Sequence, residues 1–450
     1  MKTAINRLPH RITIIAQTVA KAVGKSVAKL SVVAAIAAIV ILATTPAGLL
    51  SANDKVSTAP ILLAAADTSR LLPLTSIASP DALISKALQD IRASRMDDAL
   101  REVNRAIALR PDFKLAHLIR GDLLTARMRP LAGLGAASKV PTESLDDLRD
   151  EARVRLLRYI DQPAPDLLPR QILQLAPQQK YALLADTSRA RLYLFENIDG
   201  VPRLKSDFYM TIGKNGTDKR VEGDKRTPMG VYQIVEQLPR AGLADLYGDG
   251  AYPLNYPNEW DQMQGRGGHG IWLHGVPSNT YSRPPRSSDG CVVVANPDLK
   301  ELSRWIKVGS TPVIITNRTD WISQEEWEQS RDNLLAQLNR WKSDWEARDP
   351  DRFLLHYSGN MTNGQGATWA KDKRRNILSK DWIRINLSDI SLFLYGNGNM
   401  AYAEFTQSYS SNTLSSLSSK RLYWQMQQGT WRVALEKSID IPISDQLAQR

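Results

Sequence analysis

The sequence predicts a multidomain α+β protein: a helical region, then a mainly β domain, then a C-terminal α+β cone of helices and antiparallel strands. Three observations predict it. At 450 residues, the chain exceeds the size of a single hydrophobic core. The apolar period changes from helical to alternating near residue 181, and a second helix-to-strand change follows residue 323. Few helices separate the middle strands, which argues against a doubly wound sheet.

The first fifty residues predict export. Residues 30–50 carry no charged side chain, and about 20 apolar residues are enough to cross a bilayer. Basic residues precede this span, so the N-terminus is expected to stay cytoplasmic. A cleaved signal peptide is the alternative, because Thr45-Pro46-Ala47 offers small residues before a cleavage site. Either way, residues 1–50 place the body in the periplasm or cell envelope, and an uncleaved anchor makes the inner membrane a partner.

The positive charge is concentrated in this N-terminal segment. Six basic residues and no acidic one lie in the first fifty residues, out of a formal net charge of +11. The remaining excess is mild for 400 residues and gives little support for nucleic-acid binding, so no nucleic-acid partner is expected. Residues 51–78 are rich in Ala, Ser, Thr and Leu without a clear period, and are expected to be a linker.

Residues 79–175 are expected to form a helical region that resembles tetratricopeptide repeats. Helical spacing runs over residues 79–129, and a further amphipathic helix is expected over 143–159. The resemblance covers about one and a half repeats, and a plain helical hairpin is the alternative. A single repeat cannot bury its own face, so this region is expected to pack on another element or on a cell-wall protein partner. The residues that carry the resemblance are Ala87, Ala99, Val103, Ala106 and Pro111.

Residues 176–318 are expected to form the mainly β domain. Runs of strand-type residues alternate with turn signals, and residues 297–306 indicate one helix with proline in its first turn. The expected strands are 181–185, 190–196, 207–213, 231–235, 271–273, 291–294 and 311–316.

Residues 319–450 are expected to form the α+β cone. A helix over residues 323–348 carries several tryptophans on one side, and strands follow from residue 383. Helices followed by a curled antiparallel sheet resemble the nuclear transport factor 2-like fold, including the Trp-Arg-Val-Ala-Leu-Glu ending at 431–436. This resemblance implies a fold and a further surface for a wall-protein partner, and it confers no chemistry by itself.

The single cysteine marks the candidate active site. Cys291 follows Ser288-Asp289-Gly290 and precedes an apolar strand, and His274-Gly275 ends another apolar strand upstream. A thiol, an imidazole and backbone N–H groups at a glycine turn are the parts of a cysteine nucleophile site. A lone cysteine cannot form an internal disulfide, so a reactive thiol is expected, with core packing as the alternative. No metal-ligand spacing is present, and no cofactor is expected.

These motifs resemble the L,D-transpeptidase catalytic (YkuD-type) family, whose pattern is His-Gly, a spacer, then Ser/Thr-x-Gly-Cys. The loop at residues 223–230 resembles the family's loop before the site, and the resemblance covers about 181–316. It implies a thioester acyl-enzyme on peptidoglycan stem peptides. By position, Cys291 is the nucleophile, His274 the base, and the Gly290 and Cys291 N–H groups the oxyanion hole. Ser288 is expected to hydrogen-bond within the site.

Other residues are candidates for holding the imidazole or the substrate. A backbone carbonyl near Gly275 is expected to orient His274. Gly275 and His269, the latter in a glycine-rich loop, are candidate substrate contacts, and Arg283 and Arg286 are candidates for a stem-peptide carboxylate. Solvated loop charge is the alternative for both arginines. Many members of the family carry arginine two residues after the cysteine, whereas this chain has Val293.

Three functions remain open at this point. Transfer of the acyl group to an amine gives an L,D-transpeptidase that forms 3→3 crosslinks or protein–wall links. Transfer to water gives an L,D-carboxypeptidase or a hydrolase of wall–protein links, and the Gly-Cys-Val-Val-Val form resembles the subgroup with such members. A nuclear transport factor 2-like domain also accompanies a cell-shape L,D-carboxypeptidase of this kind. A wall-binding scaffold, the non-enzymatic alternative, predicts a buried and inert Cys291.

Overall fold

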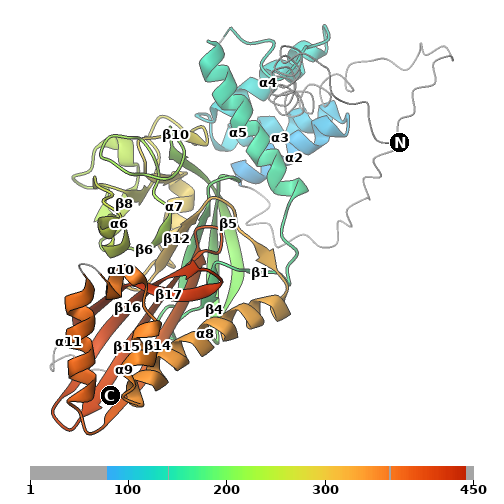
Figure 1. Cartoon of the computed structure of the whole chain (residues 1–450). Helices are drawn as coiled ribbons and strands as arrows, with labels where there is room; N and C mark the ends of the chain where they lie inside the picture. Colours follow the sequence, from blue (N-terminus) through green and yellow to red (C-terminus); the bar gives the residue numbers. More distant parts are fainter. Residues whose placement is uncertain (1–78, 140, 364–365, 442–450) are drawn as a thin grey trace, which may run out of the picture. The chain divides into compact units, whose positions relative to one another are not determined.

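The computed structural model describes residues 79–139, 141–363 and 366–441 (Figure 1). The expected anchor at 30–50 and linker at 51–78 lie outside the described residues. Within the described ranges, none of the helices combines the length and the apolar character needed to cross a bilayer. The chain divides into two compact units, one holding the N-terminal helices up to Ala152 and the other running from Arg153 onward.

The first unit consists of helices, as predicted. Ser79 caps the first helix by accepting a hydrogen bond from the Ala82 N–H, and Pro80 occupies the first turn. Ala87 and Ala99 are fully buried, which lets the first two helices approach closely. The tetratricopeptide resemblance stays a prediction. The helices are α2 (Pro80–Arg92), α3 (Met96–Leu109), α4 (Lys114–Ala126) and α5 (Thr142–Ile160), the last of which ends in the second unit.

The last helix ends close to the predicted residue 159, but strands occupy the end of the region assigned to helices. The sequence predicted a helical region up to residue 175, whereas α5 ends at Ile160 and two short strands follow, β1 (Leu168–Pro169) and β2 (Ile172–Gln174). Prolines at 163, 165 and 169 lack the N–H that a helix needs and disfavour helical backbone in the residue before them. Strand β2 then joins the C-terminal sheet rather than the helices, because it pairs with β14.

The mainly β part is a half-barrel in the order β6-β12-β3-β4-β5-β11-β9-β8-β7, with β10 added beside β5. Three of its strands, each two to four residues long, and two short helices of three and five residues were not predicted, because so few residues carry too short a pattern. The strands are β3 (Tyr181–Asp186), β4 (Arg191–Ile198), β5 (Val201–Gly213), β6 (Gly230–Gln233), β7 (Leu238–Pro239), β8 (Gly250–Pro253), β9 (Trp272–His274), β10 (Arg286–Ser288), β11 (Val292–Val294) and β12 (Pro312–Thr316); the helices are η2 (Asp245–Tyr247), α6 (Glu259–Met263) and α7 (Asn296–Leu302).

The C-terminal part is the predicted α+β cone. Its antiparallel sheet has the order β17-β16-β15-β14-β2, and β13 (Trp321–Ile322) pairs with β1. Figure 1 shows the orange helices lying along the red strands. The elements are α8 (Gln324–Glu346), α9 (Pro350–Leu355), α10 (Gly359–Thr362), α11 (Ala367–Leu378), β14 (Ile383–Tyr395), β15 (Met400–Ser411), β16 (Ser415–Gln427) and β17 (Thr430–Asp440).

The two faces of this C-terminal sheet belong to different cores. One face packs on α8 through buried tryptophans such as Trp327 and Trp341. The other face shares an apolar layer with the half-barrel, in which Phe393 and Tyr402 lie in one cluster with Phe195. The fold class predicted from the sequence is therefore confirmed, with one addition: the second and third parts share a core.

Candidate active site

Cys291 and His274 lie on one face of two neighbouring strands. Strand β11 runs parallel to β9, with Val292 opposite Leu273 and Val293 opposite His274. Because Leu273 and Val292 belong to the buried core, the alternation of side chains along a strand turns His274 and the preceding Cys291 to the opposite face. Cys291 therefore directly precedes β11, and His274 is the last residue of the neighbouring strand β9. The residue opposite His274 is Val293, two positions after Cys291.

The His274 ring is buried and held in one tautomer. Its Nδ1 lies 2.6 Å from the Gly275 carbonyl oxygen. A carbonyl only accepts hydrogen bonds, so Nδ1 carries the proton and Nε2 keeps its lone pair. The Tyr247 ring packs edge-on at 5.1 Å between centroids. The expectation that a backbone carbonyl near Gly275 orients the ring is confirmed.

Burial sets the charge of this imidazole. Desolvation lowers the pKa of His274 to about 4, against the opposing hydrogen bond to Gly275, and the nearby charge of Arg283 lowers it further. At neutral pH the ring is therefore uncharged, with Nε2 free to accept a proton. This is the state that a general base needs.

The glycine after His274 is required by packing. A Cβ on Gly275 would lie 2.1 Å from Oδ1 of Asn296. That amide oxygen accepts hydrogen bonds from the N–H groups of Asp249 and Val276, and its Nδ2 donates to the Val276 carbonyl. The sequence placed Gly275 among the substrate contacts, whereas its observed contacts hold the His274 ring and the start of α7.

We expect Gly275→Ala to lower the free energy of unfolding by about 1–3 kcal/mol, because the methyl group overlaps the Asn296 amide. Displacement of the His274 carbonyl partner is also expected to slow Cys291 turnover. Thermal unfolding and activity of the full chain measure both effects. Gly267→Ala is the matched control, since nothing lies within 4 Å of a Cβ there. An unfolding midpoint equal to that of the control would contradict the packing argument.

The turn before the thiol is built from three hydroxyl and backbone contacts. Gly290 has φ of +127°, and a Cβ there would lie 2.8 Å from the Arg226 carbonyl oxygen. Ser288 Oγ donates to the Cys291 carbonyl at 2.7 Å and accepts from the Gly290 N–H at 3.2 Å. Thr227 Oγ1 donates to the Gly290 carbonyl. Ser288 thus bonds within the site, as expected, and its bond to Gly290 occupies one N–H assigned to the oxyanion hole.

The Cys291 thiol is protonated at rest. Burial raises its pKa, against the Trp272 backbone hydrogen bond and the positive charge of Arg283. The thiol donates to the Gly270 carbonyl at 3.4 Å. A neutral thiol beside a neutral imidazole suits proton transfer during attack, rather than a preformed thiolate–imidazolium pair.

Two family models match the chain. Residues 180–315 match the L,D-transpeptidase catalytic domain family YkuD. The chain carries a YkuD-family catalytic domain. Residues 333–437 match the Cds6 C-terminal NTF2-like domain, which agrees with the cone seen there. A YkuD domain implies peptidoglycan stem peptides as the substrate class.

Solved structures resemble both domains together. Bd1075 from Bdellovibrio bacteriovorus is 27% identical, and the match covers 62% of this chain and 100% of that one with a TM-score of 0.55. The helical cell shape determining protein Pgp2 from Campylobacter jejuni shares the fold at 23% identity, covering 62% of this chain and 97% of that one with a TM-score of 0.51. None of the curated proteins matches.

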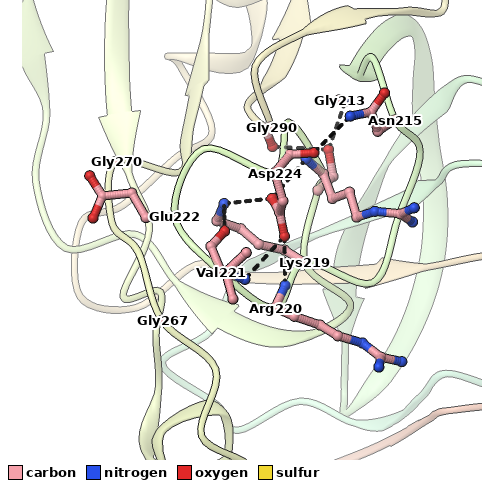
Figure 2. Close-up of polar contacts among 12 residues, drawn as sticks. Gly213, Asn215, Lys219, Arg220, Val221, Glu222, Asp224, Gly267, Gly270 and Gly290 are labelled. Carbon is pink, nitrogen blue, oxygen red and sulfur yellow. Dashed lines mark hydrogen bonds and ion pairs between the residues drawn. The ribbon is translucent and has the colours of Figure 1, made fainter.

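The loop of the YkuD domain before the site is organised by Asp224 (Figure 2). Its carboxylate accepts from Lys219 Nζ at 2.9 Å and from the backbone N–H groups of Arg220, Val221 and Arg226. Although burial opposes it, this set of donors lowers the pKa of Asp224 to about 2. Buried Lys219 also favours the Cys291 thiolate. The sequence pointed to Gly223-Asp224 but missed Lys219, because a single lysine carries no spacing signal.

The candidate substrate contacts of the YkuD domain differ in their exposure and in their contacts. His269 is 80% exposed and lies 3.9 Å from Glu222. Arg286 is exposed on β10, and its side chain makes no hydrogen bond or ion pair within the described residues. Arg283 is half-buried, and its charge acts on both His274 and Cys291. Among the described residues, no cluster of three or more His, Cys, Asp or Glu is arranged to hold a metal ion.

Proposed function

We propose that this protein is a cysteine-dependent L,D-transpeptidase that acts on the tetrapeptide stems of peptidoglycan in the cell envelope. Cys291 attacks the peptide carbonyl that follows the L-centre of meso-diaminopimelate, releases the terminal D-alanine and forms a thioester. Transfer to an amine then gives a 3→3 crosslink or a protein–wall link. The observation that carries the proposal is the pairing of β9 with β11, which sets the Cys291 thiol and the neutral His274 ring on one face.

The chemistry balances with these two side chains alone. As the bond from Sγ to the carbonyl carbon forms, Nε2 of His274 takes the thiol proton, and the Cys291 N–H, after the Gly290 turn, stabilises the oxyanion. The C–N bond then breaks, and the imidazolium gives its proton to the leaving amine. An acceptor amine or water then attacks the thioester while His274 takes its proton, the C–S bond breaks, and the imidazolium returns the proton to the Cys291 thiolate.

Hydrolysis of the same acyl-enzyme is the second candidate, and it makes the protein an L,D-carboxypeptidase. The observation that favours it is Val293, which is 1% exposed and stands where many family members carry arginine. Pgp2, which shares this fold, is described as a helical cell shape determining protein. We extend that role to this chain: trimming of stem peptides would limit the crosslinks available to the wall and so influence cell shape.

Purified full-length protein incubated with tetrapeptide muropeptides tests both candidates. We expect release of D-alanine with 3→3 dimers if an amine is the acceptor, or with tripeptide monomers if water is. Mass spectrometry of the products distinguishes them. If wild type leaves every muropeptide unchanged, as Cys291→Ala does, both enzymatic candidates are wrong. A slow, solvent-like rate of Cys291 alkylation at neutral pH would then favour a wall-binding scaffold.

A further inference from the structure

Arg283 is a half-buried cation without a carboxylate partner. Its guanidinium donates through Nη2 to the Ser287 carbonyl, and no acidic group of the described residues lies within ion-pair distance of it. The two lysines that approach the same site are already paired, Lys219 with Asp224 and Lys225 with Asp289. A guanidinium removed from water gains from an anion that accepts its remaining N–H groups. Arg283 is therefore available to a negatively charged ligand.

The backbone of Arg283 is fixed by β5. Its carbonyl accepts from the Tyr209 hydroxyl at 2.8 Å and from Thr211 Oγ1 at 3.0 Å. Tyr209 is buried in turn beneath Arg155, whose guanidinium lies 4.0 Å from the ring centroid. Two hydroxyls on alternate residues of one strand thus hold this position of the spacer, which is what orientation of a substrate group requires.

Hydrogen bonds and strand pairing place Arg283 beside the reacting groups. Thr211, which binds its carbonyl, pairs with Val293 on β11, and Arg283 Nη2 donates to the carbonyl of Ser287, four residues before Cys291. Its positive charge disfavours protonation of His274 and favours the Cys291 thiolate. Arg286, three residues on, is exposed and does neither. Buried, apolar Val293 cannot supply a cation from the strand beside His274. Apart from the Nη2 bond to Ser287, the guanidinium N–H groups of Arg283 have no hydrogen-bond partner among the described residues and can bind a ligand near the thiol.

We propose that Arg283 binds the free α-carboxylate of the amino acid that leaves from the scissile bond, so that the site accepts only stems whose terminal residue is not crosslinked. This inference rests on the proposed function. The α-carboxylate of the leaving residue is separated from the attacked carbonyl carbon by only a nitrogen and an α-carbon. A cation near both Cys291 and His274 is therefore placed to meet it. When the terminal D-alanine is joined to another stem, its carboxylate has become an amide and has no charge to offer.

The test compares two substrates that differ only in this group. A synthetic tetrapeptide ending in D-alanine and the same peptide ending in D-alaninamide are given separately to the full chain, and kcat/KM is measured from the released amino acid. Wild type is expected to prefer the carboxylate by about 30-fold or more, since a truncated charged hydrogen-bonded pair costs that much. Arg283→Gln is expected to lose this preference by slowing the carboxylate substrate far more than the amide substrate; the loss of its charge near Cys291 and His274 changes both rates by a common factor. Arg283→Lys is expected to keep part of the preference, because the lysine ammonium keeps the positive charge but loses the planar, two-pronged hydrogen bonding of the guanidinium.

Matched controls distinguish carboxylate binding by Arg283 from the proposed acyl-transfer activity. Arg304→Gln removes an exposed arginine that pairs with Glu301 on the surface, and it is expected to retain the preference. Equal wild-type rates on both peptides, an equal fall on both in Arg283→Gln, or loss of the preference in Arg286→Gln would each overturn the inference while the proposed function stands. Release from neither peptide by wild type, as in Cys291→Ala, would overturn the function as well. If Arg283→Gln unfolds early, the wild-type preference and Arg283→Lys still decide.

Discussion

Cys291→Ala is expected to lower the rate of D-alanine release from tetrapeptide stems by at least about 10⁴-fold, which is the scale seen when an enzyme loses its nucleophile. No neighbouring group can replace the thiol. The hydroxyl of neighbouring Ser288 donates to the Cys291 carbonyl and accepts from the Gly290 N–H, so it stabilises the turn. Chromatography of the muropeptides measures the rate, and intact-protein mass spectrometry shows whether an acyl group stays on the enzyme.

The same substitution should leave the fold nearly unchanged. The thiol donates one long hydrogen bond, to the Gly270 carbonyl at 3.4 Å, and the substitution removes a single heavy atom. We therefore expect Cys291→Ala to lose activity while it unfolds at the same temperature as the wild type. A variant that keeps more than a tenth of the wild-type rate would show that Cys291 is not the nucleophile.

His274→Gln is expected to slow the reaction by about 10²- to 10⁴-fold, because the amide keeps a hydrogen-bonding group but cannot take the thiol proton. The wild-type rate should also stay high well into acid. Burial holds the pKa of His274 at about 4, so the ring remains a neutral base far below the usual range of histidine. A pH profile of kcat/KM checks this, and a fall already centred near pH 6.5 would contradict it.

The same pKa predicts how stability changes with pH. The pKa of about 4 in the folded protein lies below the ordinary histidine value of 6.5, so between these values the unfolded chain binds the proton more readily. The contribution of the neutral ring to the free energy of unfolding is fully present above pH 6.5. It declines as the pH falls to 4, by up to about 3 kcal/mol. Thermal unfolding between pH 7 and 4.5 measures it. His274→Gln should weaken that pH dependence, whereas His117→Gln, at an exposed position on α4, should preserve it.

The strands and the thiol–imidazole pair could be predicted because their signals are local. Apolar alternation near residue 181, the Ser-x-Gly-Cys turn and the His-Gly pair each lie within a few neighbouring residues. The structural reason for Gly275 could not be predicted, because it depends on contact with Asn296, twenty-one residues away and on another element. The same holds for β2, which looked like the end of a helical region and pairs with β14 more than two hundred residues later.

The roles of the two arginines between His274 and Cys291 could not be predicted from the sequence for the same reason. From residue type alone, Arg283 and Arg286 were equal candidates for a carboxylate. Only the hydroxyls of Tyr209 and Thr211, on a strand about seventy residues earlier, hold Arg283 beside the reacting groups. Strand spacing alone does not reveal which loop residue a distant hydroxyl will fix.

The shared layer between the half-barrel and the C-terminal sheet has a consequence for how this molecule can be divided. Arg421 on β16 reaches Glu259 of α6 at 2.6 Å, and Tyr423 stacks on Trp260 at 5.8 Å. A protease cut just after β12 that released about the last 130 residues would remove Arg421, the ion-pair partner of Glu259. It would also expose the apolar cluster around Phe195 to water. We therefore expect the YkuD domain and the C-terminal cone to unfold together, and we expect neither to be stable alone after such a cut.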